Sequence, residues 1–140
     1  MPIINVKEVT PKSIRGVIPE DYRAMPYIAL NEGDKITIKS CIFSVYPARN
    51  KETHEPITVQ KGPNAGKIIT NITVYFELSD GHYTSLKNDV VTGQMCALTG
   101  FDDSSDVGYY RFDFEPETVT VCKTETKMGQ KTVPILAFQQ

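Results

Sequence analysis

The chain has 140 residues, 40% of them hydrophobic, which fits one globular domain with a core of its own. Its formal net charge of −2 argues against a protein that coats DNA by charge alone, because phosphate neutralisation supplies most non-specific affinity. No apolar run approaches the ~20 residues of a membrane helix, and the N-terminus lacks a signal-peptide pattern. We therefore expect a cytoplasmic protein without a membrane partner.

The side chains that carry catalysis or bind metals are few and scattered. Cys41, Cys96 and Cys122 are odd in number and form no CxxC pair, so the sequence predicts reduced, mostly buried thiols rather than a disulfide framework or a zinc site. His54 and His82 are the only histidines, and neither has a metal-ligand spacing. Without a nucleophile elbow or a carboxylate pair, we expect no catalytic residue, metal or cofactor, and no enzyme.

Charges are sorted along the chain. Six basic side chains against two glutamates give residues 35–67 a net charge of +4, whereas six acidic side chains against Arg111 give residues 101–117 a net charge of −5. Residues 118–140 carry three lysines against Glu125, a net +2. A mixed, solvated surface is one interpretation of this pattern, and separate basic and acidic binding segments are the other.

Residues 1–34 contain regularly spaced prolines, which favour short extended pieces over a helix. Residues 3–6 and 14–18 fit brief strands, residues 19–23 fit one helical turn with Pro19 at its first position, and residues 25–30 fit an extended packing segment. We expect this leader to cover an open sheet edge or to reach a neighbouring subunit.

The first long strand is predicted over residues 35–46. Its apolar alternation begins with Ile36 and Ile38 but continues with Cys41, Phe43 and Val45, so the phase slips by one residue near Lys39. Such a slip is typical of a β-bulge, which lets a strand bend sharply. The following loop, residues 47–66, is longer than compact domains normally use, which favours a functional role. Its glycines lack the spacing of a phosphate-binding P-loop.

The second strand is predicted over residues 67–78, with Val74 and Phe76 facing the core and Asn71, Thr73 and Tyr75 facing outward. A turn at residues 80–81 leads into a third strand over residues 82–86. A short helix over residues 89–98 follows, with an N-cap at 88 or 89 and a C-terminal glycine at 100.

The last part of the chain is predicted as an exposed acidic loop and a hairpin. The loop covers residues 102–106. The hairpin pairs residues 118–125 with residues 131–138 across the turn at 127–130. Pro134 indicates that the last strand has a free edge or a bulge, because proline donates no ladder hydrogen bond.

This order of elements resembles the OB-fold, a mainly β, five-stranded barrel with one short helix between strands three and four. The resemblance covers residues 35–138, and it implies an OB-fold domain over residues 35–140 with the leader, residues 1–34, packed on the barrel. In that fold the ligand crosses strands two and three, between the loop that joins strands one and two and the loop that joins strands four and five. Both of those loops are basic in this chain.

In size and layout the chain is similar to the small single-stranded DNA-binding proteins of bacteriophages. The resemblance implies binding of single-stranded DNA without strong sequence preference, in replication or recombination, in the host cytoplasm. Lysines and arginines would follow the phosphates while tyrosines stack on bases, with core packing as the alternative for each aromatic. The residues assigned to this surface are Lys39, Tyr46, Arg49, Lys51, Lys61, Lys67, Asn71, Thr73, Tyr75, Tyr83, Lys127 and Lys131.

Proteins are the other expected partners. The chain lacks the acidic tail with which many single-strand binding proteins recruit replication proteins, so residues 102–106 are the candidate for that contact. The leader and the edge strand at Pro134 are compatible with a homo-oligomer. The alternative function is a protein-interaction module, such as a phage inhibitor of a host defence enzyme, whose acidic loop would mimic nucleic acid.

Overall fold

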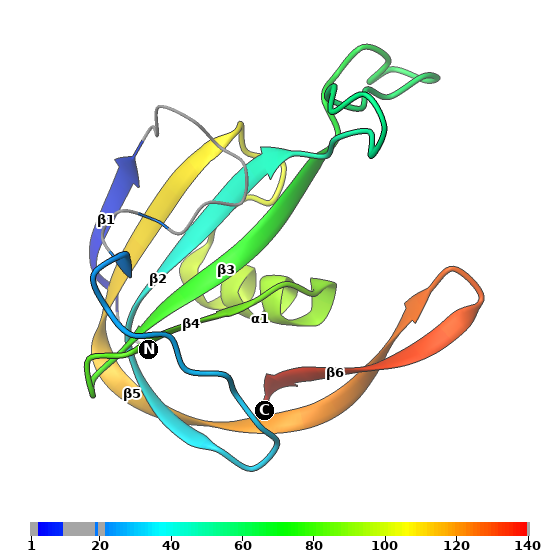
Figure 1. The fold of residues 1–140 in the computed structure, drawn as a ribbon. Coiled ribbons are helices and arrows are strands. Elements are labelled where there is room, and N and C mark those ends of the chain that lie inside the picture. The colour runs from blue at the N-terminus through cyan, green and yellow to red at the C-terminus, as the bar shows by residue number, and fades with distance from the viewer. Residues whose placement is uncertain (1–2, 10–18, 20–21, 140) are drawn as a thin grey trace.

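The computed structural model describes the backbone of residues 3–9, residue 19 and residues 22–139. Its elements are β1 (Ile3–Val9), β2 (Lys35–Pro47), β3 (Thr70–Leu78), β4 (Tyr83–Leu86), α1 (Asp89–Thr99), β5 (Gly108–Met128) and β6 (Lys131–Phe138). The fold is mainly β, and its antiparallel strands curl around α1 (Figure 1).

The strands are hydrogen-bonded in the order β1-β5-β2-β3-β4, and β6 pairs with β5. All five predicted strands and the helix between the third and fourth of them are present. The fourth begins ten residues before its predicted start and ends three residues after its predicted end. The stretch from Gly108 onwards, interpreted as part of an acidic segment, is the first half of β5. In this half Phe112 and Phe114 are buried and alternate with Arg111, Asp113 and Glu115, so it has the period-2 pattern of a half-buried strand.

The closed barrel that the sequence predicted is only half formed, since no ladder joins β4 to β6 within the described residues. Side-chain amides of α1 occupy the free edge of β6 instead. Gln94 Nε2 donates to the Phe138 carbonyl at 2.7 Å, and the Phe138 N–H donates to Gln94 Oε1 at 3.1 Å. Asn88 Nδ2 donates to the Leu136 carbonyl at 2.9 Å. The predicted free edge at Pro134 is therefore confirmed, and the helix covers part of that edge.

The predicted bulge is confirmed. The pairing register of β2 shifts between Ile38 and Ser40 against both β3 and β5. Across this point, Ile38 pairs with Glu117 whereas Ser40 pairs with Asp113. The shift keeps the residues on both sides of it in one core, so Ile36, Ile38, Cys41 and Phe43 all belong to the same buried cluster.

The helix begins and ends where the sequence predicts. Asn88 is the N-cap, and its Oδ1 accepts a hydrogen bond from the Val91 N–H at 2.8 Å. Gly100 adopts the left-handed conformation with φ 75°, and its N–H donates to the Cys96 carbonyl. Val91 and Met95 are fully buried against the inner face of the sheet. Packing therefore holds this short helix in spite of Gly93.

Two described parts of the leader lie along edges of the sheet. β1 pairs with β5, and it extends three residues beyond the strand predicted at 3–6. Residues 26–28 run beside β4: the Tyr83 N–H donates to the Pro26 carbonyl, and the Ile28 N–H donates to the Tyr83 carbonyl, both at 3.0 Å. The Tyr22 N–H donates to the Pro19 carbonyl in the predicted turn. The strand predicted at 14–18 lies outside the described residues.

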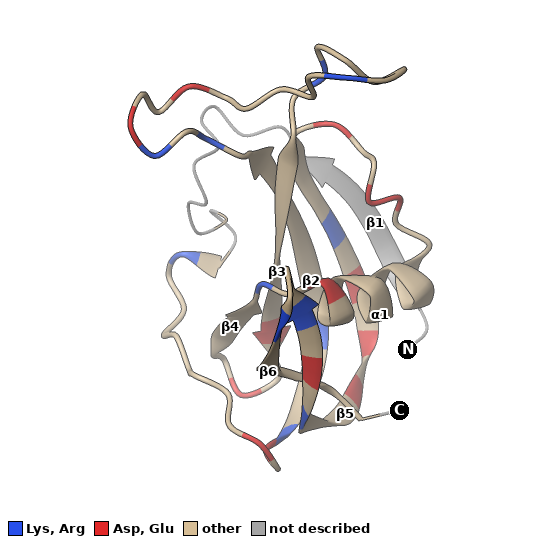
Figure 2. Cartoon of the chain, turned by 90° about the vertical axis from the view of Figure 1, so that its right-hand side faces the viewer, with Lys and Arg blue, Asp and Glu red and all other residues tan. Residues whose placement is uncertain are grey.

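Two extensions project from the sheet as separate features: the arm, residues 48–69, between β2 and β3, and the β5–β6 hairpin (Figure 1). Four basic residues and two acidic ones, Glu52 and Glu55, lie on the arm, whereas the charged residues of the loop between α1 and β5 are all acidic (Figure 2). This loop leads into Gly108, which pairs with Val45 near the root of the arm. Opposite charges therefore meet at one end of the sheet.

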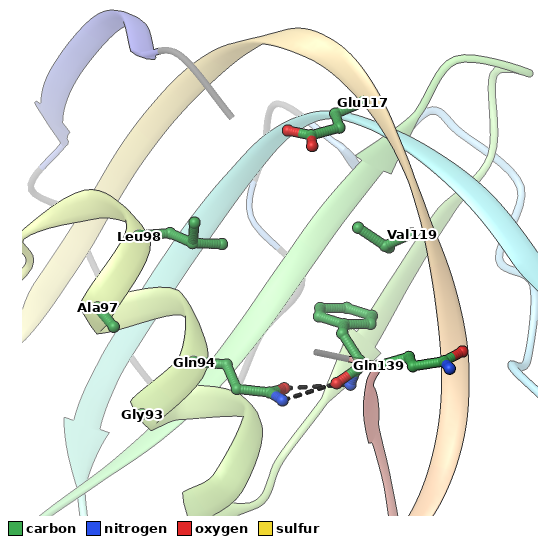
Figure 3. Close-up of a pocket in the computed structure, with 8 residues that line it drawn as sticks. Gly93, Gln94, Ala97, Leu98, Glu117, Val119 and Gln139 are labelled. Atoms are coloured by element: carbon green, nitrogen blue, oxygen red, sulfur yellow. Dashed lines mark hydrogen bonds between the residues drawn. The ribbon is translucent and has the colours of Figure 1, made fainter.

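The opening of the half-barrel leaves a space between α1, β5 and the end of β6. We call this space of about 680 Å³ the helix hollow (Figure 3). Its lining includes Ala97, Leu98, Val119 and Phe138, with Glu117 at one end. The hollow is mostly apolar and accessible from solvent.

Candidate nucleic-acid interface

The arm is an ordered structure rather than a loose loop. At its base three backbone segments form a closed ring of hydrogen bonds: the Ala48 N–H donates to the Ile69 carbonyl, the Ile69 N–H to the Ile57 carbonyl and the Ile57 N–H to the Ala48 carbonyl, at 2.7–2.8 Å. Two lobes rise from this ring, at residues 50–55 and 59–67. The side chains at the arm's root therefore have fixed positions on the sheet.

The first lobe is tightened by its own side chains. Asn50 Oδ1 accepts hydrogen bonds from the Glu52 and Thr53 N–H groups. His54 has a positive φ of 61°, the one non-glycine residue with a positive φ among the described residues. Arg49 Nη1 donates to the His54 carbonyl at 3.0 Å, which stabilises this conformation. Backbone strain of this kind concentrates at functional sites.

At the root of the arm, five residues line a hollow of about 230 Å³: Tyr46, Pro47, Arg49, His54 and Asn71. Tyr46 and Asn71 are cross-strand neighbours of β2 and β3. The Tyr46 hydroxyl is 3.2 Å from Thr73 Oγ1.

Lys87 also belongs to this group, because its Nζ lies 5.3 Å from the centroid of the Tyr46 ring. We define the arm-root site as Tyr46, Arg49, His54, Asn71 and Lys87. It combines an aromatic ring, an amide and two permanent cations. This set can bind a planar, anionic ligand by stacking, hydrogen bonding and charge.

Of the basic residues assigned from the sequence, Arg49 lies in the arm-root site, and Lys51, Lys61 and Lys67 are exposed on the arm above it. Each lobe therefore carries at least one cation, and the first lobe also carries Glu52 and Glu55 (Figure 2). Lys127 and Lys131 are exposed on the β5–β6 hairpin, which projects apart from the arm (Figure 1). The structure therefore does not bring the two basic loops together around one surface.

Tyr75 and Tyr83 are not open stacking surfaces, so this part of the expectation is wrong. Tyr75 lies on the predicted face, opposite Val74 and Phe76, but only 6% of it is exposed, and only 7% of Tyr83 is. Both belong to a second buried group, which we call the outer cluster: Tyr22, Ile42, Tyr75, Tyr83 and Tyr109. Burial raises the pKa of Tyr75 to about 12. Tyr22 of the leader covers the sheet face that the sequence pattern predicted to be exposed to solvent.

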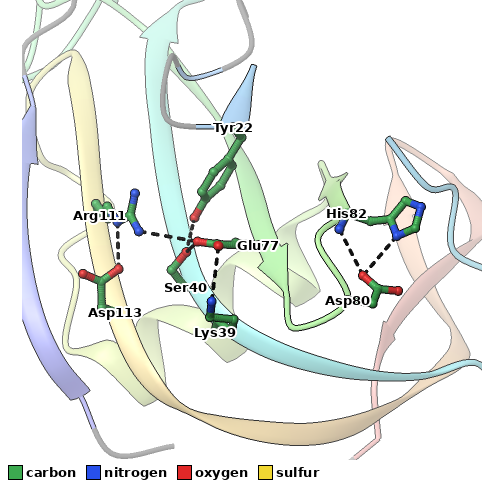
Figure 4. A network of polar contacts seen from close by, with 8 residues as sticks. All are labelled: Tyr22, Lys39, Ser40, Glu77, Asp80, His82, Arg111 and Asp113. Carbon is green, nitrogen blue, oxygen red and sulfur yellow. Dashed lines mark hydrogen bonds and ion pairs between the residues drawn. The ribbon is translucent and has the colours of Figure 1, made fainter. Parts of the chain in front are cut away.

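Lys39 lies at the bulge, away from the arm, in a polar network beneath the leader (Figure 4). Its Nζ is 3.7 Å from Glu77 Oε2, and Arg111 Nη2 is 3.5 Å from Glu77 Oε1. Ser40 Oγ donates to Glu77 Oε1 at 2.9 Å and lies 2.6 Å from the Tyr22 hydroxyl. Glu77 therefore accepts a hydrogen bond from Ser40, which in turn contacts Tyr22 of the leader. Glu77 also forms ion pairs with Lys39 and Arg111.

Two members of the arm-root site were missed. The position of Lys87 could have been predicted from the sequence. It continues the alternation of Tyr83 and Ser85, which places it on the same sheet face as Thr73 and Tyr75. His54 was interpreted as loop surface. No local pattern indicates its position, which depends on how the arm folds back on the end of β2.

Comparisons with known proteins do not extend these observations, because no family model, curated protein or solved structure matches the chain. Within the described part of the chain, no helix has the length and apolarity needed to cross a membrane. The same residues bring together no group of three or more His, Cys, Asp or Glu side chains that could hold a metal ion.

Proposed function

We propose that the protein binds single-stranded DNA at the arm-root site and along the arm, by contact rather than by catalysis. The observation that carries this proposal is the convergence of the Tyr46 ring with Asn71, Arg49 and Lys87 at the base of a basic arm. A single strand offers unpaired bases for the ring and phosphates for the cations.

The phosphate contacts are assigned to Arg49 and Lys87 at the root and to Lys51, Lys61 and Lys67 on the arm. Each lysine is exposed. Since counterion release drives such binding, affinity falls as salt rises. Lys127 and Lys131 stay predicted contacts for a strand long enough to reach the hairpin.

The stacking contact is assigned to Tyr46 alone, because Tyr75 and Tyr83 are buried. Asn71 lies beside the ring in register and offers an amide to a base edge. Thr73 fixes the ring through its hydroxyl. One stacked base contributes about 1–3 kcal/mol whatever its identity, which fits binding without strong sequence preference.

We also propose that the fold is an open variant of the OB-fold. Apart from β1, the strands lie in the order β6-β5-β2-β3-β4 with the helix directly after β4. This arrangement supports the resemblance to phage single-stranded DNA-binding proteins and, with it, a role in replication or recombination.

Fluorescence anisotropy with labelled oligo-dT at low salt tests the function. We expect wild type to bind and Tyr46→Ala to lose about 1–3 kcal/mol of binding free energy, with Tyr46→Phe retaining most of the affinity because it keeps the ring. Lys61→Ala should reduce the slope of log affinity against log salt by about 0.7.

The matched control is Lys123→Ala, which removes the same charge from an exposed position on β5 and should leave affinity and slope unchanged. Absence of binding by wild type at low salt contradicts the function. Equal binding by wild type and Tyr46→Ala contradicts the site.

A protein-interaction module is the second candidate. The arm carries three isoleucines, Ile57, Ile68 and Ile69, that are each 39–47% exposed, and apolar side chains of this size are typical of protein contacts. If wild type fails to bind oligo-dT, the arm and the exposed acidic loop at residues 102–106 become the surface for a protein partner.

A further inference from the structure

The helix hollow is an apolar site with a negative rim. Leu98 is 44% exposed at its mouth, next to Val119 and Phe138. Glu117 lies at one end of it (Figure 3). The last turn of α1, which forms one wall, contains no basic residue, so the partial negative charge of the helix C-terminus is not compensated there.

Glu117 is the one charged residue among those that line the hollow. The occupant that fits the hollow therefore combines an apolar side chain with a neighbouring cation.

The tip of the β5–β6 hairpin has this combination. Met128 is 68% exposed, the highest value among the exposed large hydrophobic residues described. Lys131 is its directly paired cross-strand neighbour, so both side chains lie on one face of the hairpin. Gly129, with φ 67°, closes a tight turn between them. The tip is thus a compact, preformed element.

The hairpin cannot enter the hollow of its own chain. Met128 lies nine positions after Val119 on β5, which corresponds to roughly 30 Å along an extended strand. In addition, Thr126 Oγ1 donates to Asp89 Oδ1 at 3.0 Å, which holds the hairpin at the N-terminal end of α1. The hollow begins about one turn farther along the helix, at Gly93, and extends to Leu98.

We propose that the hairpin tip of one copy docks in the helix hollow of a second copy, with Met128 against Leu98 and Val119 and with Lys131 toward Glu117. Tip and hollow are different surfaces, so the contact is heterologous and each added copy leaves one tip and one hollow open. The contact is small and therefore weak and concentration-dependent. It does not depend on the proposed function.

Sedimentation velocity of the full chain without nucleic acid tests this proposal. We expect wild type to form larger species as its concentration rises. Met128→Asp and Leu98→Asp should each raise the dissociation constant roughly tenfold or more, because each places a carboxylate in an apolar contact with a negative rim. Both positions are exposed, so the monomer should stay folded.

A mixture of the two variants gives the decisive result. Met128→Asp retains a hollow and Leu98→Asp retains a tip, so an equimolar mixture should form a heterodimer and nothing larger. Ile28→Asp, at an exposed position of the leader beside β4, is the matched control and should assemble like wild type. A charge exchange, Glu117→Lys with Lys131→Glu, should restore association that either change alone weakens.

A wild type that stays monomeric up to its solubility limit would overturn the proposal. So would assembly that survives both aspartate substitutions, or a variant mixture without a heterodimer. Because no nucleic acid is present, failure here is distinct from failure of oligo-dT binding.

Discussion

The two faces of the curled sheet are buried by different means. The inner face packs Val, Ile, Phe and Met side chains against α1 and the end of β6. The outer face packs Ile42 and three tyrosines, and Tyr22 covers them from a turn of the leader rather than from a helix. Pro19 and Tyr22 of the leader are fully buried, and the Tyr22 hydroxyl is hydrogen-bonded to Ser40 Oγ. The inner face therefore depends on apolar packing and the outer face depends partly on hydrogen bonds, so they should respond differently to the same type of change.

The largest effect is expected on the inner face. Phe76 is fully buried and packs edge-on against Phe138, with ring centroids 5.3 Å apart. Phe76→Ala should lower the free energy of unfolding by about 3–5 kcal/mol, because it opens a cavity that the strands cannot fill. Urea unfolding followed by circular dichroism measures this loss, and Phe76→Leu, which retains most of the volume, is the control.

Loss of the leader's anchor should have a smaller and more local effect. Tyr22→Phe retains the ring but removes the hydrogen bond to Ser40, at a cost of about 0.5–1.5 kcal/mol. Hydrogen exchange should quicken at the amides of Ile28 and Tyr83, which join leader and β4. Equal acceleration at the amides of α1 would show that the outer cover unfolds only with the whole domain, and the contrast between the two faces would be lost.

Alkaline pH should weaken the outer face selectively. Burial raises the pKa of Tyr75 from 10 to about 12, so the folded state keeps this proton while the unfolded state loses it. The stability that Tyr75 contributes is present below about pH 10 and declines as pH rises toward 12. Unfolding free energies measured across that interval should fall less steeply for Tyr75→Phe than for wild type. An unchanged slope would mean that Tyr75 ionises as easily in the fold as outside it.

The smallest effect is expected at the edge of the polar network. Lys39 is about half exposed and reaches Glu77 at 3.7 Å. Lys39→Ala should change the free energy of unfolding by less than about 1 kcal/mol, since water and salt screen such pairs. Glu77→Gln is the informative comparison, because Glu77 also accepts from Ser40 and pairs with Arg111. A larger loss for Lys39→Ala than for Glu77→Gln would contradict the role assigned to Glu77.

Local patterns predicted the inner face well. The phase slip located the bulge between Ile38 and Ser40, and the residues at 88 and 100 located both ends of α1. These features depend on neighbouring residues and on the side-chain period, both of which the sequence displays. The first half of β5 was missed because its acidic residues were weighted above the alternation of Phe112 and Phe114.

The candidate site was harder to predict because it depends on distant contacts. Alternation placed Tyr75 on the outer face correctly, but whether that face is open depends on Tyr22, more than fifty residues earlier in the chain. Tyr46 and Asn71 were identified from their strands, whereas His54 reaches them only through the fold of the arm. Strand periodicity identifies the face of a residue but not what covers it.

The hydrogen-bonded ring of Ala48, Ile57 and Ile69 closes the arm before either lobe begins. The backbone that enters and leaves each lobe is thus fixed by bonds outside the lobe itself. The two lobes, residues 50–55 and 59–67, are thus separate insertions that share one hydrogen-bonded base. We therefore expect changes in the length or composition of either lobe to leave the register of β2 against β3 unaltered.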